Sequence, residues 1–507
     1  MFYRIAAAET AQTRRGRDRR TGPDQERFPL MRLALPAASA AGLAILTLAG
    51  CASVREPTTT LPQTYEAPAG AATPAAGLDT WWTAFGDAQL DGLIDQALRA
   101  SPDALSAAAR LAEARAVAQT ALAALLPNGS LQGQGRKTHT EQLSGTVINI
   151  PGFSTNGDSE SYSANFDVSW EIDLFGRLRS GRRAARGDVA AARFNYEGAR
   201  ASLAANVADT YFQARGLAIQ FDEARETVRI QQALQNVADR RAQRGLGAIS
   251  DADRVAGDLA QAQARAAGLE AELQAARRTL LVLVGRGAEP TANLPVIADL
   301  GAVPAVPATL PSELLARRPD VREAQARIAS AAGRLDVAER AFFPTFTLTP
   351  GLGWSRSLQP EFSSTTRNWS IGGAVSQPIL DIPQLLIDLK AQSARTEQAV
   401  IDYEKVVQTA FAEAENSLVQ LDADRRGVVL LQGGERRAAR AYEAARIRYV
   451  AGIDDLQQAL AAEQAWRATR TQLTTAQVQA LRRAVQAYKA LGGGWPAESL
   501  PMNARAR

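Results

Sequence analysis

The chain carries an internal duplication, and this duplication constrains its fold more than any single motif. A Pro-Asp pair opens a run rich in alanine and arginine, and a second proline closes the run 25 residues later. The pattern occurs at 102–127 and again at 319–344, an offset of 217 residues. In both copies, alternating polar and apolar residues follow the closing proline. A repeat of this length predicts two similar structural units rather than one compact core.

Each repeat also contains a long proline-free stretch that predicts one very long helix. In the first, the residues from 177 to 289 are mainly Ala, Arg, Glu, Gln and Leu, which favour helix. Apolar side chains recur there in steps of four and three, the spacing of a coiled-coil seam, at Val207, Tyr211, Ala214, Ala218 and Phe221. A helix from Leu178 to Arg244 would be about 100 Å long. A rod of that length cannot lie inside a compact domain, and it suggests the wall of a tube.

Both long helices are expected to turn back. In the first repeat, Gly245-Leu246-Gly247 ends the helix, and Ser250 and Asp251 resemble an N-cap for a return helix that ends near Gly285. The preceding helix of roughly 25 residues and the return helix of roughly 35 together match the long helix in height. We therefore expect these two shorter helices to stack end to end beside it.

The second repeat has the same plan. Its proline-free stretch runs from Pro383 to Pro496, and its long helix reaches Tyr449. Ala451-Gly452-Ile453 interrupts the helix, and Asp454-Asp455 is expected to cap a return helix that ends at 491–494.

Strand signals lie between the short and the long helix of each repeat. Six consecutive polar–apolar alternations fill 161–172, and the partner strand is expected within 131–146. A second hairpin is expected over about 345–377, around a loop at 359–367. One face of these strands is apolar, which fits either a transmembrane β-strand or an ordinary half-buried sheet. Four strands cannot close a barrel around an open lumen, so a membrane role requires further copies of the chain. Three copies would supply twelve strands, although the sequence alone does not select that number.

The first fifty residues have the pattern of an export signal. Arg32 precedes an apolar run from Leu33 to Ala49, followed by Gly50 and Cys51, which favours a signal peptide over 1–50, with Met31 as the real start. A retained anchor helix is the alternative. The sequence Leu-Ala-Gly-Cys resembles the lipobox of bacterial lipoproteins, which implies a covalent lipid on Cys51, the only cysteine.

Composition argues against several function classes. Residues 1–50 hold eight Arg against four acids, so the remaining chain has 49 basic and 49 acidic residues and no excess charge for nucleic acid. The chain has one histidine (His139), one cysteine and no nucleotide-binding glycine motif. It therefore has few of the residues that an enzyme active site or a metal site requires. We expect no enzymatic activity and no cofactor beyond the lipid. Trp170, Trp354 and Trp369 are candidates for a membrane-interface girdle, whereas Trp81 is expected in the core.

Four motifs identify a family resemblance. They are Trp170-Glu-Ile-Asp-Leu-Phe-Gly-Arg177, Arg318-Pro-Asp-Val321, Tyr449-Val-Ala-Gly452 and Tyr488-Lys-Ala-Leu-Gly-Gly-Gly-Trp495. With them the chain resembles the TolC-type outer-membrane efflux channels, in the lipoprotein branch that works with resistance-nodulation-division pumps. The resemblance implies a mainly α-helical protein with a small β part: a coiled-coil α-helical barrel joined to a transmembrane β-barrel that a homotrimer closes, four strands per protomer, in the outer membrane of a Gram-negative bacterium. It further implies a periplasmic adaptor and an inner-membrane pump as partners.

The same resemblance places function at the tips of the helical hairpins. Adaptor docking is expected at Gly245, Leu246, Gly247, Ser250, Asp251, Asp253, Gly452 and Ile453. Gate candidates are Tyr449, Asp454, Asp455, Arg446 and Arg448, although Asp454 and Asp455 are also explained as helix caps. Many relatives carry a further Asp where this chain has Ala461, so an acidic ring at that level is not expected.

These observations divide the chain into a leader (1–50), a lipidated tether (51–80), a first repeat (81–290), a linker (291–310), a second repeat (311–495) and a tail (496–507). The favoured function is a passive exit duct for drugs or other small amphiphiles. The alternatives are the exit duct of a type I protein-secretion system and a periplasmic coiled-coil scaffold lipoprotein that forms no channel.

Overall fold

The structure is a computed structural model that describes residues 56–66, 78–141, 143–144, 157–245, 248–306, 311–359, 362–451, 453 and 456–495. Cys51 and the leader lie outside this range. One order of elements occurs twice: a short helix, two strands, a long helix and a return helix. The first repeat contains α3 (Pro102–Ala123), β1 (Asn128–Thr140), β2 (Gly157–Ile172), α4 (Arg177–Gln243) and α5 (Ile249–Leu283). The second contains α7 (Pro319–Arg340), β3 (Thr345–Gln359), β4 (Phe362–Ser376), α8 (Ile382–Val450) and α9 (Leu456–Ala490).

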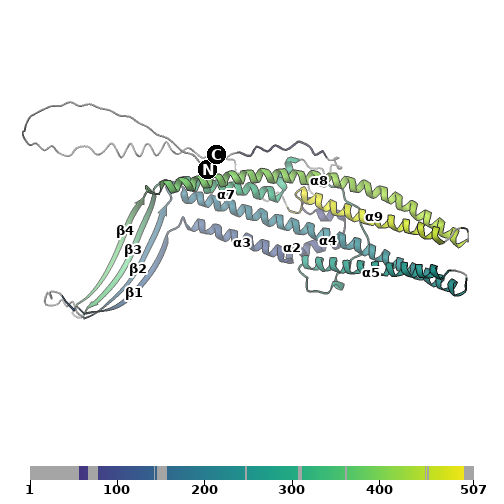
Figure 1. Cartoon of the computed structure of the whole chain (residues 1–507). Coiled ribbons are helices and arrows are strands. Elements are labelled where there is room, and N and C mark those ends of the chain that lie inside the picture. The colour runs from purple at the N-terminus through teal and green to yellow at the C-terminus, as the bar shows by residue number, and fades with distance from the viewer. Residues whose placement is uncertain are drawn as a thin grey trace, which may run out of the picture. The chain divides into compact units, whose positions relative to one another are not determined.

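The two long helices are confirmed. Helix α4 has 67 residues and α8 has 69, so each extends about 100 Å. The shorter helices α3 and α5 both pack on α4, and α7 and α9 pack between α4 and α8. Figure 1 shows the sheet at one end of the long helices and both helical hairpins at the other. Among the described residues, no helix is long and apolar enough to cross a membrane.

The predicted N-cap of the first return helix is wrong. Helix α5 already begins at Ile249, after Ala248, whose side chain makes no capping bond. Ser250 and Asp251 therefore lie in the first turn, where the Asp251 carboxylate still interacts favourably with the helix dipole. The chain reverses because Gly245 adopts a left-handed conformation, with φ of 70°.

The strands form one antiparallel sheet in the order β1-β2-β3-β4. The predicted loop at 359–367 is wrong, since β4 starts at Phe362 and Arg367 already pairs with Trp354. Ser363, Thr365 and their neighbours are polar on both faces, so the alternation that marks a strand is lost there. The backbone ladder continues nevertheless, because its hydrogen bonds do not depend on side-chain polarity.

The two repeats meet along α4 and α7, which approach each other at glycines. A Cβ atom added at Gly187 would lie 2.6 Å from the backbone nitrogen of Ser330, and one added at Gly333 would lie 2.6 Å from that of Ala184. No side chain larger than hydrogen fits at either position without moving a backbone.

The main core lies halfway along the helices. Trp81, in a short 3-10 helix (Trp81–Phe85), is fully buried, as expected, and stacks on Tyr488 with ring centroids 5.6 Å apart. Helix α2 (Ala88–Ala100) covers this core with an apolar face. Tyr211 of α4 is also fully buried and donates a hydrogen bond to Asp87, the residue that caps α2. We call this cluster the waist core.

Candidate functional site

The sheet has one apolar and one polar face. Directly paired residues of an antiparallel sheet share a face, and the register joins the apolar positions of all four strands. Phe166 pairs with Leu131 and Leu352, and Leu352 pairs with Trp369. That face carries Leu131, Tyr162, Phe166, Val168, Trp170, Ile172, Phe346, Leu348, Leu352, Trp354, Trp369, Ile371 and Val375.

The opposite face is made of small polar residues. It carries Ser161, Ser163, Asn165, Asp167, Ser169, Thr345, Thr347, Thr349, Asn368 and Ser370. A Cβ added at Gly353 would meet the side chains of Asn165 and Asn368, so these three residues share that face. Large apolar residues such as Leu352, Trp369 and Ile371 are 60 to 76% exposed. Such an exposed apolar face needs lipid or another protein to cover it.

The strands and the helices follow the same lateral order across the molecule. Strands β1 and β4 form the two edges of the sheet, and in the helical part α3 and α5 stand on the outer side of α4 while α8 stands beyond α7 and α9. The part of the chain that the structure describes is therefore an open slab, with strand ladders unsatisfied at β1 and β4.

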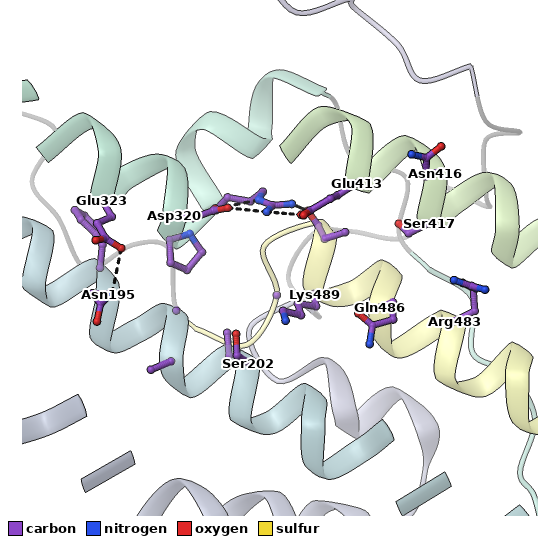
Figure 2. A pocket seen from close by; sticks show the side chains of 18 of the residues that line it. Asn195, Ser202, Asp320, Glu323, Glu413, Asn416, Ser417, Arg483, Gln486 and Lys489 are labelled. Atoms are coloured by element: carbon purple, nitrogen blue, oxygen red, sulfur yellow. Dashed lines mark hydrogen bonds and ion pairs between the residues drawn. The ribbon is translucent and has the colours of Figure 1, made fainter. Parts of the chain in front are cut away.

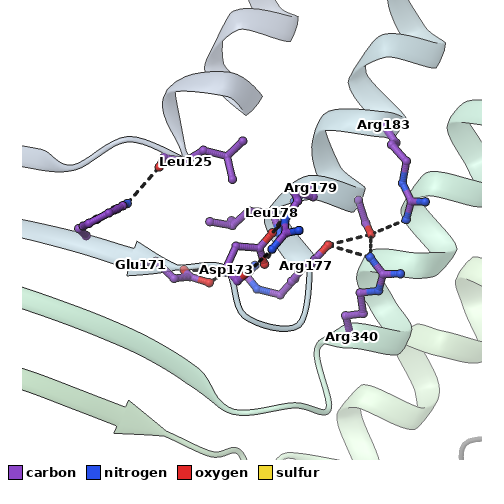
Figure 3. Close-up of polar contacts among 11 residues, drawn as sticks. Leu125, Glu171, Asp173, Arg177, Leu178, Arg179, Arg183 and Arg340 are labelled. Atoms are coloured by element: carbon purple, nitrogen blue, oxygen red, sulfur yellow. Dashed lines mark hydrogen bonds and ion pairs between the residues drawn. The ribbon is translucent and has the colours of Figure 1, made fainter.

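A polar joint connects β2 to α4, and Figure 3 shows its parts. Arg177 donates two hydrogen bonds to Glu171, at 2.7 and 2.8 Å, and Trp170 Nε1 donates to the Leu125 carbonyl at 3.1 Å. Arg340 of α7 donates to the Gly176 carbonyl at 2.8 Å. One of the four resemblance motifs, from 170 to 177, thus sets the angle at which the long helix leaves the sheet.

Asp173 caps the same joint. Its carboxylate accepts the backbone N–H groups of Leu178 at 3.2 Å and Arg179 at 2.9 Å. Burial of this carboxyl opposes ionisation, but the hydrogen bonds from Arg179 and Leu178 outweigh it and hold the pKa of Asp173 below its usual value.

The gap between α7 and α9 holds a cavity of about 890 Å³ (Figure 2). Buried Arg318 bridges its wall, with Nη2 2.7 Å from Asp320 and 2.7 Å from Glu413 of α8, while Nη1 donates to the Ala490 carbonyl at 3.1 Å. The C-terminal glycines fit against this corner, where Gly492 has φ of 77° and Trp495 Nε1 donates to the Arg317 carbonyl at 2.8 Å. Two more of the resemblance motifs therefore meet here and join α7, α8 and α9.

An extended segment, residues 56–66, runs along the outside of α8, and we call it the strap. The Thr58 backbone N–H donates to Glu404 at 2.8 Å, and the Glu66 N–H donates to Glu415 at 3.2 Å. Tyr65 stacks on Phe411 with centroids 5.9 Å apart. Glu413, on the cavity wall, is two residues from Phe411, which is about 200° around a helix. The strap and the cavity therefore occupy opposite faces of α8.

The described residues include part of the predicted tip sites. Gly245 ends α4, and Ser250, Asp251 and Asp253 occupy the start of α5. Ile453 is 68% exposed between α8 and α9. Leu246, Gly247, Gly452, Asp454 and Asp455 lie outside the described residues, as does the side chain of Tyr449.

Arg446 pairs with Glu443 of its own helix, at 2.6 Å. That pair neither supports nor excludes a contact to the tip aspartates. The docking and gating roles of the tip residues, including Arg448, stay predictions.

Sequence reasoning missed a cluster above the tips, which we call the inter-coil cluster. Arg467 of α9 bonds Thr227 of α4 and, through Nε, Glu463 at 2.9 Å. Arg470 Nε lies 2.7 Å from Glu223 of α4 and stands over the ring of Trp466, which stacks on Tyr442. The Arg467–Thr227 and Arg470–Glu223 contacts join the α8–α9 coil to the α4–α5 coil, about 240 residues away in sequence, and only the coiled-coil spacing of both partners hints at them.

Comparison with known proteins agrees with this architecture. The model of a family described as outer membrane efflux protein matches residues 93–286 and 310–493. The pyoverdine export outer membrane protein OpmQ of Pseudomonas putida is 31% identical over 466 residues, which are 90% of this chain and 97% of OpmQ. The probable outer membrane lipoprotein SilC of Salmonella typhimurium is 27% identical over 89% of this chain and 97% of SilC. A solved structure of the outer-membrane channel OprN matches with a TM-score of 0.75 at 28% identity, over 88% of this chain and all of that one.

Proposed function

Because this chain belongs to the outer membrane efflux protein family and is an efflux channel of the Gram-negative outer membrane, we propose that three copies complete the conduit and that drugs or other small amphiphiles leave through it. The observation that carries the trimer is the open slab. If β4 of one copy pairs with β1 of the next, three copies of four strands give a barrel in the size range of membrane barrels. The column of α3 and α5 from one copy would then face α8 of the next.

Closure of the barrel by three copies determines which face of the sheet lines the lumen. The apolar face of the sheet must meet lipid, so the Ser, Thr and Asn face lines the lumen. In the helical part the strap leads back to Cys51 and must run outside the tube. The cavity at Arg318, on the opposite face of α8, then opens inward.

The strap also supports lipidation of Cys51. Glu404 is 22 residues past the start of α8 at Ile382, or about 33 Å along the helix. Seven extended residues between Cys51 and Thr58 span about 24 Å. Cys51 can therefore come within about 10 Å of the sheet end of α8, close to the inner leaflet of the outer membrane. Replacing Cys51 with Ser should abolish incorporation of radiolabelled palmitate, while the barrel still holds the protein in the membrane.

We further propose that the helical tips dock on a periplasmic adaptor, which couples the conduit to an inner-membrane resistance-nodulation-division pump. The tips stand at the end farthest from the sheet (Figure 1). Ile453 and Ile249 are exposed there. Adaptor hairpins with small apolar side chains fit such a surface.

The test uses purified protein and cells together. In detergent the protein should have the mass of three chains, and in planar bilayers it should form water-filled pores that are mostly closed. Expressed with its adaptor and pump in a host lacking its own outer-membrane channel, it should restore drug resistance. Restored polypeptide secretion without drug resistance would select the type I secretion alternative, and a stable monomer without conductance would overturn the conduit itself.

A further inference from the structure

Every strand carries a charged residue on the apolar face of the sheet near its hairpin end. Toward the hairpin ends, which lie farthest from the helices (Figure 1), the first charged residues on this face are Lys137 on β1, Glu160 on β2, Arg356 on β3 and Arg367 on β4. On β1, Gly133 and Gly135 precede Lys137, and on β3, Leu358 follows Arg356. The register fixes their side: Lys137 pairs with Glu160, Arg356 with Tyr162 and Arg367 with Trp354. The change from apolar to charged therefore occurs at nearly one height across the sheet.

The apolar band that ends at these charged residues is as tall as the hydrocarbon core of a membrane, so the charged residues lie at its outer boundary. From Ile172 to Tyr162, β2 presents its apolar face over ten residues, about 33 Å along the strand. At the usual tilt of about 40° this spans roughly 25 Å, the height of the apolar band of a membrane barrel. With the helices on the periplasmic side, as the proposed function requires, the charged residues lie at the headgroups of the outer leaflet.

The acidic residues of this zone are already neutralised. Lys137 Nζ lies 3.1 Å from Glu160 and 3.4 Å from Asp158, and His139 Nδ1 lies 2.6 Å from Asp158. Arg356 and Arg367, by contrast, are exposed and form no ion pair with any residue that the structure describes. A guanidinium group keeps its charge at any physiological pH. Two cations at the edge of hydrocarbon, unpaired among the described residues, offer a binding site for an anion from outside the protein.

We propose that Arg356 and Arg367 bind the phosphate groups of outer-leaflet lipid. The two residues are diagonal neighbours on paired strands, since Arg356 pairs with Thr365 and Arg367 follows two positions later. Their Cβ atoms are then about 7–8 Å apart, so the two side chains can contact the two phosphate groups of one lipid molecule. The planar guanidinium donates two parallel hydrogen bonds to phosphate oxygens, and the adjacent Trp354 and Trp369 lie against the acyl chains below.

The experiment measures lipid retention by the intact protein. The full-length protein in phosphatidylcholine nanodiscs is titrated with diphosphoryl lipid A, and bound lipid is counted by native mass spectrometry. Wild type should bind diphosphoryl lipid A more tightly than monophosphoryl lipid A. Arg356→Gln and Arg367→Gln should each weaken binding by about tenfold, the worth of a charge-assisted hydrogen bond, and Arg→Lys at the same positions should retain part of it.

Arg136 supplies the matched control, because it lies next to Lys137 on β1 but on the polar face. Arg136→Gln should leave lipid A binding unchanged. Equal binding of both lipids by wild type, or equal loss in Arg136→Gln, would overturn the proposal. Oligomer mass and conductance in phosphatidylcholine are measured on the same samples, and their failure would count against the conduit rather than against the phosphate site.

Discussion

The waist core and the inter-coil cluster hold the same helices together by different means. At the waist, Trp81, Tyr211 and Tyr488 are almost fully buried, and apolar residues of α2, α4, α5, α8 and α9 surround them. Near the tips, α4 and α9 are joined mainly by Arg467, Arg470 and their polar partners, with Trp466 and Tyr442 stacked beside them. Burial on the scale of the waist resists any movement of the helices. Near the tips, one partly exposed ion pair, Arg470–Glu223, and the hydrogen bond from Arg467 to Thr227 can be exchanged for water or for a partner at small cost. The comparison therefore predicts that the conduit opens at the tips while the waist stays fixed.

The largest effect is expected from Trp81→Ala. Removing a fully buried indole should destabilise the protein by about 3–5 kcal/mol, measured as a fall in the thermal unfolding temperature in detergent. The Trp81 Nε1 group is buried and has no hydrogen-bond partner in the described residues. Trp81→Phe should therefore cost much less, because it keeps most of the ring and removes an unsatisfied donor. If Trp81→Ala left stability unchanged but altered conductance, the distinction between the two regions would be lost.

A smaller stability change, but the clearest change of function, is expected from Arg467→Ala combined with Arg470→Ala. Loss of these contacts should cost about 1–2 kcal/mol and should increase the open fraction of the pore in bilayers. Arg426→Ala is the control, since Arg426 is exposed and pairs with Asp422 of its own helix, α8, outside the inter-coil cluster. An unchanged open fraction in the double variant, with stability lowered, would make the cluster purely structural.

Acid should affect the β2–α4 joint. Because the pKa of folded Asp173 is below its unfolded value, this carboxylate stabilises the fold above about pH 4 and the contribution is lost as pH falls further, through the folded pKa. Asp173→Asn should remove that part of the acid dependence, so its unfolding temperature should fall less steeply from pH 5 to pH 3 than that of wild type. Parallel curves for the two proteins would show that other carboxylates govern acid unfolding.

The smallest stability effect is expected from Asp454→Ala combined with Asp455→Ala. We expect the unfolding temperature to change little and the conductance to rise. A rise would place part of the gate below the inter-coil cluster. No change in conductance would remove these two residues from the gate and leave the cluster as the main tie between the coils.

The fold followed from the sequence where a pattern was long and regular. The duplication, the proline-free stretches and the alternation at 161–172 predicted the helices and the sheet. Prediction failed where the pattern was weak. The start of β4 has polar residues on both faces, and Ser250 resembles a cap although the helix already begins at Ile249.

The candidate site was predictable only in part. The tip glycines mark the reversals in the chain, but Arg467 and Thr227 are separated by 240 residues and lie in runs rich in ordinary surface charges. Nothing in either run indicates that this arginine, rather than a neighbouring one, reaches the other coil. Arg356 and Arg367 become conspicuous only once the register assigns them to the apolar face.

The glycines at the α4–α7 crossing have a mechanical consequence. With Gly187 against Ser330 and Gly333 against Ala184, the two backbones are in close contact. Neither helix can slide along the other or rotate about its axis without a backbone clash. The parts of both repeats on the sheet side of this crossing must then move as one rigid body. A displacement at the tips would then bend the coils between the tips and this crossing, and the sheet at the other end would hardly move.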